Sequence, residues 1–146
     1  MALDRELVGR SYPPSAVYEV GRAKLAEFAT AIGADDPVPR DADAARAAGY
    51  ADVIAPPTFA IVVSLEAAFV VLSDPDVGLD YSRVVHGEQK FAHHRPIRAG
   101  DRLVATTTID AARTVAGNDL LTARVDLTTE DGEAVCTATS MLVARA

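Results

Sequence analysis

The stretch FAIVVSLEAAFVVL, from Phe59 to Leu72, decides the fold of this 146-residue chain. It is apolar on nearly every side of a helix, and Pro56 and Pro57 precede it. Proline suits a first helical turn because its missing N–H would have no helical partner there. The stretch is too short to span a bilayer and carries Glu66 in its middle. It therefore predicts a helix enclosed by other structure.

The residues after this helix change to the two-residue alternation of β-strands. Strands are predicted at 83–94, 102–113, 120–130 and 134–146, with turns at AGND (116–119) and EDGE (130–133). In the last strand, small side chains share one face, which allows a helix to approach closely. These residues are Ala134, Cys136, Ala138 and Ser140. That face is expected to cradle the apolar helix.

The residues before the apolar stretch predict a short strand at 16–20, a helix at 22–33 and a short alanine-rich helix at 41–49. We expect a single domain over residues 1–146, because this length suits one hydrophobic core. The order of elements predicts an α+β fold in which an antiparallel sheet wraps around the central apolar helix.

Composition excludes several classes of protein. The formal net charge is -7 and the pI is near 4.8, which disfavours nucleic acid and anionic membranes as partners. Cys136 is the only cysteine, so no internal disulfide can form, and the N-terminus lacks a signal-peptide pattern. We therefore expect a cytoplasmic protein. No cysteine pair or histidine cluster has the spacing of metal ligands, so no metal is expected.

Two stretches carry a resemblance to a known family. VVHGEQKFAHHRPIRAGDRL, from Val84 to Leu103, and IGADDPVPRDADAARAAGYADVIAPPTFA, from Ile32 to Ala60, resemble the MaoC-like hydratases and dehydratases. The chain is most similar to the N-terminal, FAS1-like dehydratase branch, which includes non-catalytic subunits of bacterial (3R)-hydroxyacyl-ACP dehydratases. The resemblance implies a hot-dog fold, an acyl-CoA or acyl-ACP ligand and no cofactor. It also implies a dimer, either a homodimer or a heterodimer with a catalytic MaoC-like subunit.

The catalytic block of active members reads Gly-Asp-x-Asn-Pro-aliphatic-His, with the Asp and the His as the catalytic pair. Here Gly33 and Pro37 keep their places, and Asp36 stands where Asn is expected. Ala34 replaces the catalytic Asp, and Pro39 replaces the His. Hydration or dehydration of a 3-hydroxyacyl thioester needs a positioned acid and base, and neither Ala nor Pro can serve. The resemblance thus implies a site without its catalysts.

A third catalytic element is also missing. In active relatives a glycine amide before the central helix donates a hydrogen bond to the developing enolate oxygen. Pro57 stands in its place and has no N–H to donate. The donor is therefore missing unless the backbone amide of Thr58 or Phe59 replaces it. The candidate substrate-binding residues are Thr58, Phe59, His86 and Asp36.

Three residues are candidates for residual catalysis. A shift of the alignment by one residue would place Asp35 in the Asp position, although Asp35 and Asp36 also suit a turn after a helix. His86 and Glu88, two apart on a strand, would share a face and could form an acid–base pair. Alternatively, His86 is a structural histidine and Glu88 pairs with Arg83 or Lys90.

Other polar residues favour a structural role. His93 and His94 are adjacent, so they would face opposite sides of a strand and are interpreted as a solvated strand end. Arg95, Arg98 and Arg102 could contact an acidic carrier protein or a phosphate group, or form a solvated edge.

Three functional hypotheses follow. The first is a non-catalytic, acyl-binding and stabilising subunit of a (3R)-hydroxyacyl-thioester dehydratase, a hydro-lyase of fatty-acid metabolism. The second is a self-sufficient hot-dog hydratase or thioesterase that uses His86, Glu88 or Asp35. The third is a non-enzymatic acyl-binding protein.

Overall fold

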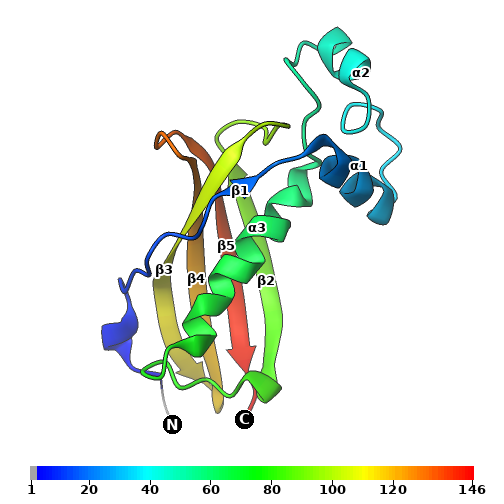
Figure 1. Cartoon of the computed structure of the whole chain (residues 1–146). Helices are drawn as coiled ribbons and strands as arrows, with labels where there is room; N and C mark the ends of the chain where they lie inside the picture. The colour runs from blue at the N-terminus through cyan, green and yellow to red at the C-terminus, as the bar shows by residue number, and fades with distance from the viewer. Residues whose placement is uncertain (1–2) are drawn as a thin grey trace.

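A five-stranded antiparallel sheet forms one layer of the computed structural model, which describes residues 3–146. Its strand order is β1-β3-β4-β5-β2, and Figure 1 shows the long strands side by side. The strands are β1 (Tyr18–Glu19), β2 (Val84–His93), β3 (Arg102–Val115), β4 (Asn118–Thr129) and β5 (Ala134–Ala144). The four long strands lie where the alternation predicts them, whereas the strand predicted at 16–20 is only two residues long.

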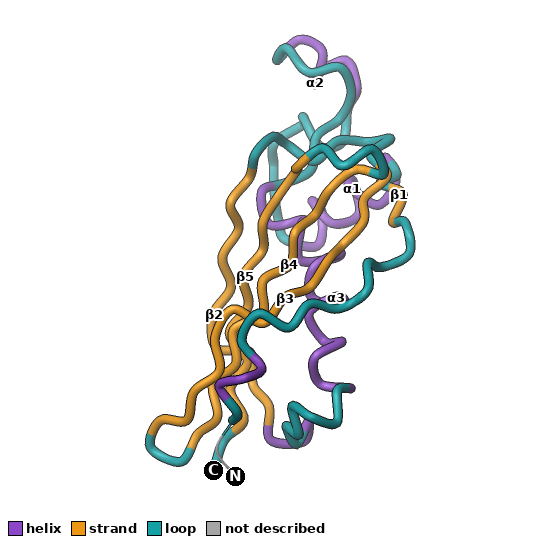
Figure 2. Tube along the Cα trace, turned by 90° about the vertical axis from the view of Figure 1, so that its left-hand side faces the viewer, coloured by secondary structure: helices purple, strands orange, loops and turns teal. Residues whose placement is uncertain are grey.

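The second layer is the apolar helix. The helices are α1 (Arg22–Ala31), α2 (Ala42–Ala47) and α3 (Ala60–Ala68). Turns of 3-10 helix at Pro57–Phe59 and Phe69–Ser73 extend α3 at both ends. Figures 1 and 2 show α3 lying along one face of the curled sheet, with α1 and α2 beyond one end of the strands. Among residues 3–146, no helix has both the length and the apolar character needed to cross a bilayer.

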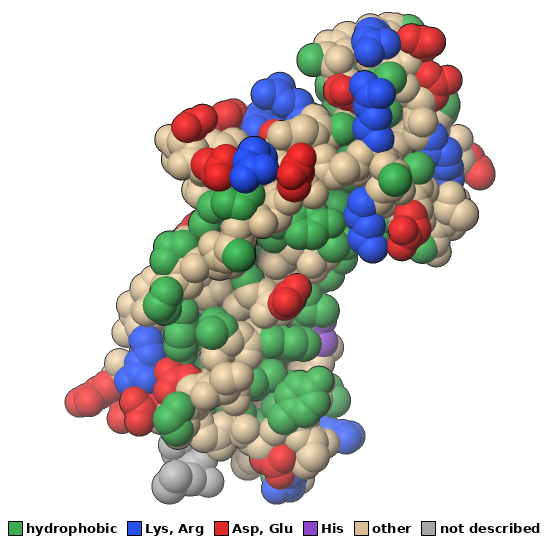
Figure 3. All heavy atoms as spheres, viewed as in Figure 1, with side chains coloured by type: hydrophobic (Ala, Val, Ile, Leu, Met, Phe, Trp, Pro, Cys, Tyr) green, Lys and Arg blue, Asp and Glu red, His purple; other side chains and the backbone are tan. Residues whose placement is uncertain are grey.

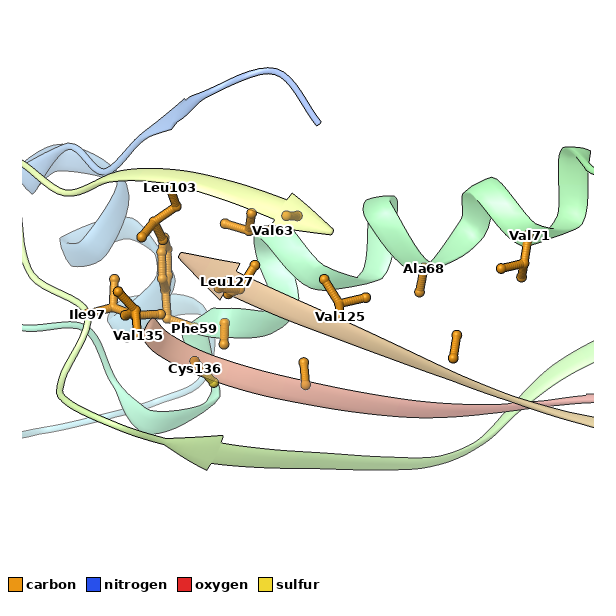
Figure 4. Packing of buried hydrophobic residues seen from close by; sticks show 14 of the residues in the cluster. Phe59, Val63, Ala68, Val71, Ile97, Leu103, Val125, Leu127, Val135 and Cys136 are labelled. Carbon is orange, nitrogen blue, oxygen red and sulfur yellow. The ribbon is translucent and has the colours of Figure 1, made fainter. Parts of the chain in front are cut away.

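The core lies between α3 and the sheet. Cys136, Ala138 and Ser140 on β5 are almost completely buried, as predicted for the small face that receives the helix. Ala134, predicted for the same face, is exposed, because the β4–β5 register shifts between Leu127 and Thr128. Phe59 has no exposed surface, and Figure 4 shows it enclosed at the start of α3. Its ring meets that of Phe28 edge-on, with 5.4 Å between ring centroids, so α1 is attached to the same core.

One prediction about α3 is wrong for the single chain. The helix is not enclosed on all sides, because the sheet covers only one of its faces. Ile61, Leu65 and Phe69, spaced four residues apart, are only half-buried, and Val70 is exposed. Figure 3 shows apolar side chains along the α3 side of the molecule. A continuous apolar stripe of α3 therefore remains open in one chain.

Candidate functional site

A cavity of about 550 Å³ lies where the loop after α1, the start of α3 and the end of β2 meet. Its lining comes from three segments that are distant in the sequence. These residues are Asp36, Val38, Pro39, Tyr50, Ile54, Ala55, Pro56, Pro57, His93, His94, Arg95, Pro96 and Ile97. The cavity thus joins the loop after α1, where the resemblance implies an altered catalytic block, to the start of α3.

The loop that carries the altered block is held by its own hydrogen bonds. Gly33 has a φ of 69°, a left-handed conformation that ends the helical segment and that glycine adopts without strain. The Asp36 carboxylate accepts a hydrogen bond from the Val38 N–H (2.9 Å), so it stabilises the turn. Pro39 is buried in the cavity lining, whereas Asp35 is exposed and does not line the cavity.

The start of α3 contributes two prolines to the cavity. Pro56 and Pro57 line it, and neither has an amide hydrogen. The Phe59 N–H donates to the Pro56 carbonyl (2.9 Å), which removes one of the two replacement donors considered above. Thr58 is exposed but is not part of the lining.

His93 is a residue of this cavity that sequence reasoning missed. It is exposed, but its Nε2 lies 2.8 Å from the Pro57 carbonyl oxygen, a partner 36 residues earlier in the chain. In the β2–β5 pairing His93 is opposite Cys136, which puts both on the side that faces α3. The strand alternation indicated which residues share a face with His93. It could not indicate that this face leads to the helix start.

The basic residues near the cavity are largely neutralised. Arg95 forms ion pairs with Asp101 (2.9 Å) and Glu133 (2.7 Å), and the hydrogen bonds that Arg95 donates to Asp101 raise the pKa of Arg95. Arg102 pairs with Glu130 (2.6 Å), and the hydrogen bonds that Arg102 donates to Glu130 likewise raise the pKa of Arg102. Arg98 is half exposed and lies 3.8 Å from Asp101. The three arginines therefore do not form a free cationic patch.

The predicted pair of His86 and Glu88 does not form. A β-bulge between these residues shifts the register, so that His86 is opposite Leu142 and Glu88 is opposite Met141. His86 thus lies on the face toward α3 and Glu88 on the other face. Glu88 pairs with Lys90 instead (3.3 Å), which was the alternative interpretation.

Gly87 occupies this bulge. A Cβ at Gly87 would lie 3.1 Å from side-chain atoms of Met141 and Val143. The glycine therefore allows the close approach of β5 that the bulge requires.

Three of the four predicted substrate-binding residues lie outside the cavity, and Thr58 is one of them. Phe59 belongs to the core, since it has no exposed surface through which its side chain could contact a ligand. His86 lies seven residues before His93, which is about 23 Å along a strand. Of the four predicted binding residues, only Asp36 lines the cavity.

Cys136 and metal ligands play no part in this arrangement. Burial raises the pKa of the Cys136 thiol to about 11, so the thiolate is scarce at neutral pH. Among residues 3–146, no three His, Cys, Asp or Glu side chains gather as metal ligands would.

Comparison with known proteins shows the family to which this chain belongs. The family model "FAS1-like, dehydratase domain region" matches residues 6–138. A UPF0336 protein of Saccharopolyspora erythraea is 59% identical over 145 residues, which cover 99% of this chain and 93% of the relative.

Two solved structures share the fold. The HadBC (3R-hydroxyacyl-ACP dehydratase) complex of Mycobacterium tuberculosis contains a chain that matches with a TM-score of 0.83 and 32% identity. That match covers 94% of this chain and 96% of the HadBC chain. A MaoC-like dehydratase matches with a TM-score of 0.85 and 35% identity, over 95% of this chain and 42% of its own. The chain therefore belongs to the FAS1-like dehydratase domain family and has the hot-dog fold of the MaoC-like dehydratases.

Proposed function

We propose that this protein is the non-catalytic, acyl-binding and stabilising subunit of a (3R)-hydroxyacyl-thioester dehydratase. The observation that carries the proposal is the cavity at the start of α3. Pro39, Pro56 and Pro57 line it, and under this proposal they occupy the positions of the acid–base group and the amide donor of an active dehydratase. The match to a chain of the HadBC complex supports the choice of a dehydratase.

The chemistry explains why a second chain is needed. Loss of water from a 3-hydroxyacyl thioester removes a proton next to the carbonyl and protonates the departing hydroxyl, which requires a base and an acid. The enolate oxygen that develops also requires a donor. Under this proposal a catalytic MaoC-like partner supplies the Asp, the His and the amide, while this chain contributes stability and part of the acyl site.

Two features of the chain suit such a partner. Strand β2 is an edge of the sheet, so its outer backbone groups have no strand beside them within residues 3–146. The open stripe of Ile61, Leu65 and Phe69 lies on α3, and Tyr81, which precedes β2, packs edge-on against Phe69. A partner that pairs with β2 and covers this stripe would bury apolar surface that one chain leaves in water.

The test compares the chain alone with a mixture. The protein is purified alone and together with a family member that carries the intact Asp and His, and the hydration of a trans-2-enoyl thioester is measured. We expect no activity from this chain alone, and activity of the mixture well above that of the catalytic chain alone. Hydration by this chain alone would instead support the self-sufficient enzyme. Acyl binding without any effect on the catalytic chain would support the non-enzymatic acyl-binding protein.

A further inference from the structure

We propose that the N-terminal segment of residues 9–15 is a cap that closes the β3 edge of the sheet, so that this chain adds a partner strand only through β2. The cap is an internal contact that blocks one of two pairing edges. This inference holds whichever chain pairs with β2, a catalytic subunit or a second copy. It concerns how many chains the sheet can accept.

Without the cap the sheet would have two open edges. In the order β1-β3-β4-β5-β2, the strand outside β3 is β1, which has only 2 residues, whereas β3 has 14. Strand β1 pairs with β3 only at Leu103 and Arg102. The rest of β3 would therefore present backbone N–H and C=O groups to solvent, and such a row is a template for a further strand.

The cap occupies these backbone groups with hydrogen bonds. The Gly9 N–H donates to the Ile109 carbonyl (2.8 Å), and the Ile109 N–H donates to the Arg10 carbonyl (2.9 Å). The Tyr12 N–H donates to the Thr107 carbonyl (2.9 Å). Figure 2 shows this loop segment running beside β3. The cap thus takes the place that a strand of another chain would need.

Two prolines make the cap itself a poor template. Pro13 and Pro14 are exposed, and neither has an N–H. Ser15 resumes the pairing after them, because its N–H donates to the Ala105 carbonyl and its hydroxyl accepts from the Ala105 N–H (2.9 Å each). A strand that approached from solvent would find no donor at two successive positions. Strand β2, the other edge, contains no proline.

A clasp holds the cap in place just before the prolines. It consists of Arg10 and Tyr12 in the cap and of Asp74 and Asp76, which follow the last helical turn after α3. Arg10 donates to Asp74 (2.7 Å) and to Asp76 (3.0 Å), and the Tyr12 hydroxyl donates to Asp74 (2.7 Å). Hydrogen bonds to a charged group are stronger than those between neutral groups. The clasp therefore secures the cap where its pairing with β3 is interrupted.

One open edge gives a different assembly from two. A sheet with two open edges can add chains on both sides, and such growth has no natural end. A sheet with one open edge pairs once and is then closed. With β3 capped, this chain is expected to stop at two chains joined through β2.

The experiment measures the mass of the full chain by size-exclusion chromatography with light scattering over a range of concentrations. We expect wild-type protein to form no species larger than two chains. Arg10→Ala combined with Tyr12→Phe removes the clasp, so species of more than two chains should form and grow with concentration. Pro13→Thr combined with Pro14→Thr keeps the clasp but gives the cap N–H donors, and it should also exceed two chains.

Arg22→Ala is the matched control. It removes an exposed arginine whose ion pair joins α1 to Asp52 (2.8 Å) and leaves the cap unchanged, so its mass should equal that of wild type. Amide hydrogen exchange, followed by NMR on dilute protein, locates the change. Without the clasp, the Ile109 and Ala105 N–H groups should exchange about tenfold faster, because the cap opens more often. Amides of β4, a central strand, should exchange as in wild type.

Several results would overturn the inference. These are wild-type species of more than two chains, a folded cap variant of either kind that keeps the wild-type mass, or the same rise in mass in Arg22→Ala. Unchanged exchange at Ile109 without the clasp would also reject it. If circular dichroism shows that the clasp variant is unfolded, the proline variant decides. The proposed function fails separately, because a capped protein that does not stimulate a catalytic chain loses the subunit role and keeps the cap.

Discussion

Arg95 donates two parallel hydrogen bonds to the carboxylate of Asp101, one from each terminal nitrogen and each 2.9 Å long. Asp101 is only 6% exposed and also accepts a hydrogen bond from the Arg98 N–H. This pair joins the segment after β2 to the turn before β3. It therefore holds one wall of the cavity, to which Arg95 itself belongs.

Replacing Asp101 should destabilise the fold. Asp101→Asn leaves the partly buried Arg95 charge with only the exposed Glu133 as counter-ion, so we expect the free energy of unfolding to fall by about 2 kcal/mol. Urea unfolding followed by circular dichroism measures this. Arg98→Gln is the control, because Arg98 is half exposed and its ion pair is long, and it should change stability by less than about 0.5 kcal/mol. Equal losses of unfolding free energy in the two variants would contradict the stabilising role of the Arg95–Asp101 ion pair.

The N-terminal segment gives a prediction about pH. Arg10 and Tyr12 each hydrogen-bond the Asp74 carboxylate at 2.7 Å, and these bonds lower the pKa of Asp74. The stabilisation from a lowered carboxylate pKa is complete above the unfolded pKa of about 3.9 and is lost as pH falls through the folded pKa. Tyr12→Phe should therefore lower the unfolding free energy by about 1 kcal/mol at pH 7, with a smaller difference at pH 3.

The measurement for Tyr12 is denaturant unfolding of both proteins at several pH values. A difference between wild type and Tyr12→Phe that stays constant from pH 7 to pH 3 would show that the hydroxyl acts without Asp74.

The open stripe on α3 gives a prediction about assembly. Leu65 is half-buried in the single chain, so Leu65→Asp should leave the fold intact while placing a charge in the proposed partner surface. We expect its affinity for the catalytic chain to fall by at least about tenfold, as measured by titration calorimetry. Glu66→Gln, an exposed neighbour on the same helix, serves as the matched control. Unchanged affinity of Leu65→Asp would place the interface elsewhere.

Cys136 gives a prediction about reactivity. The thiol is buried and burial raises its pKa to about 11, so alkylation by iodoacetamide at pH 7 should be far slower in the folded protein than in urea. Mass spectrometry of timed samples measures both rates. Rapid modification of the folded protein would show that the β5 face opens readily.

Most secondary structure could be predicted from the sequence because its signals are local. The alternation in β3 and β4, the prolines before α3 and the small face of β5 each depend on neighbouring residues, and all appear in the structure. The resemblance also pointed to the loop after α1, and Pro39 of that loop lines the cavity; its identity as an altered catalytic block stays a prediction. Strand ends were less accurate, and β1 is shorter than predicted because only Tyr18 and Glu19 pair with β3.

The prediction for His86 and Glu88 was wrong because a two-residue spacing indicates a shared face only in a regular strand. The bulge at Gly87 adds one residue to β2 and turns Glu88 to the opposite face. Whether a strand contains a bulge depends on how it pairs with its neighbour. That information lies in β5, more than fifty residues away.

The sequence by itself determined the fold class, the order of the elements and the lack of acid–base groups at Ala34 and Pro39, because periodicity and residue chemistry are local properties. Only the tertiary structure decided which residues meet at the cavity. It brought His93 from the end of β2 to the Pro57 carbonyl, and it left one face of α3 uncovered. Both results depend on strand register and on the curvature of the sheet, which come from contacts between residues far apart in the chain.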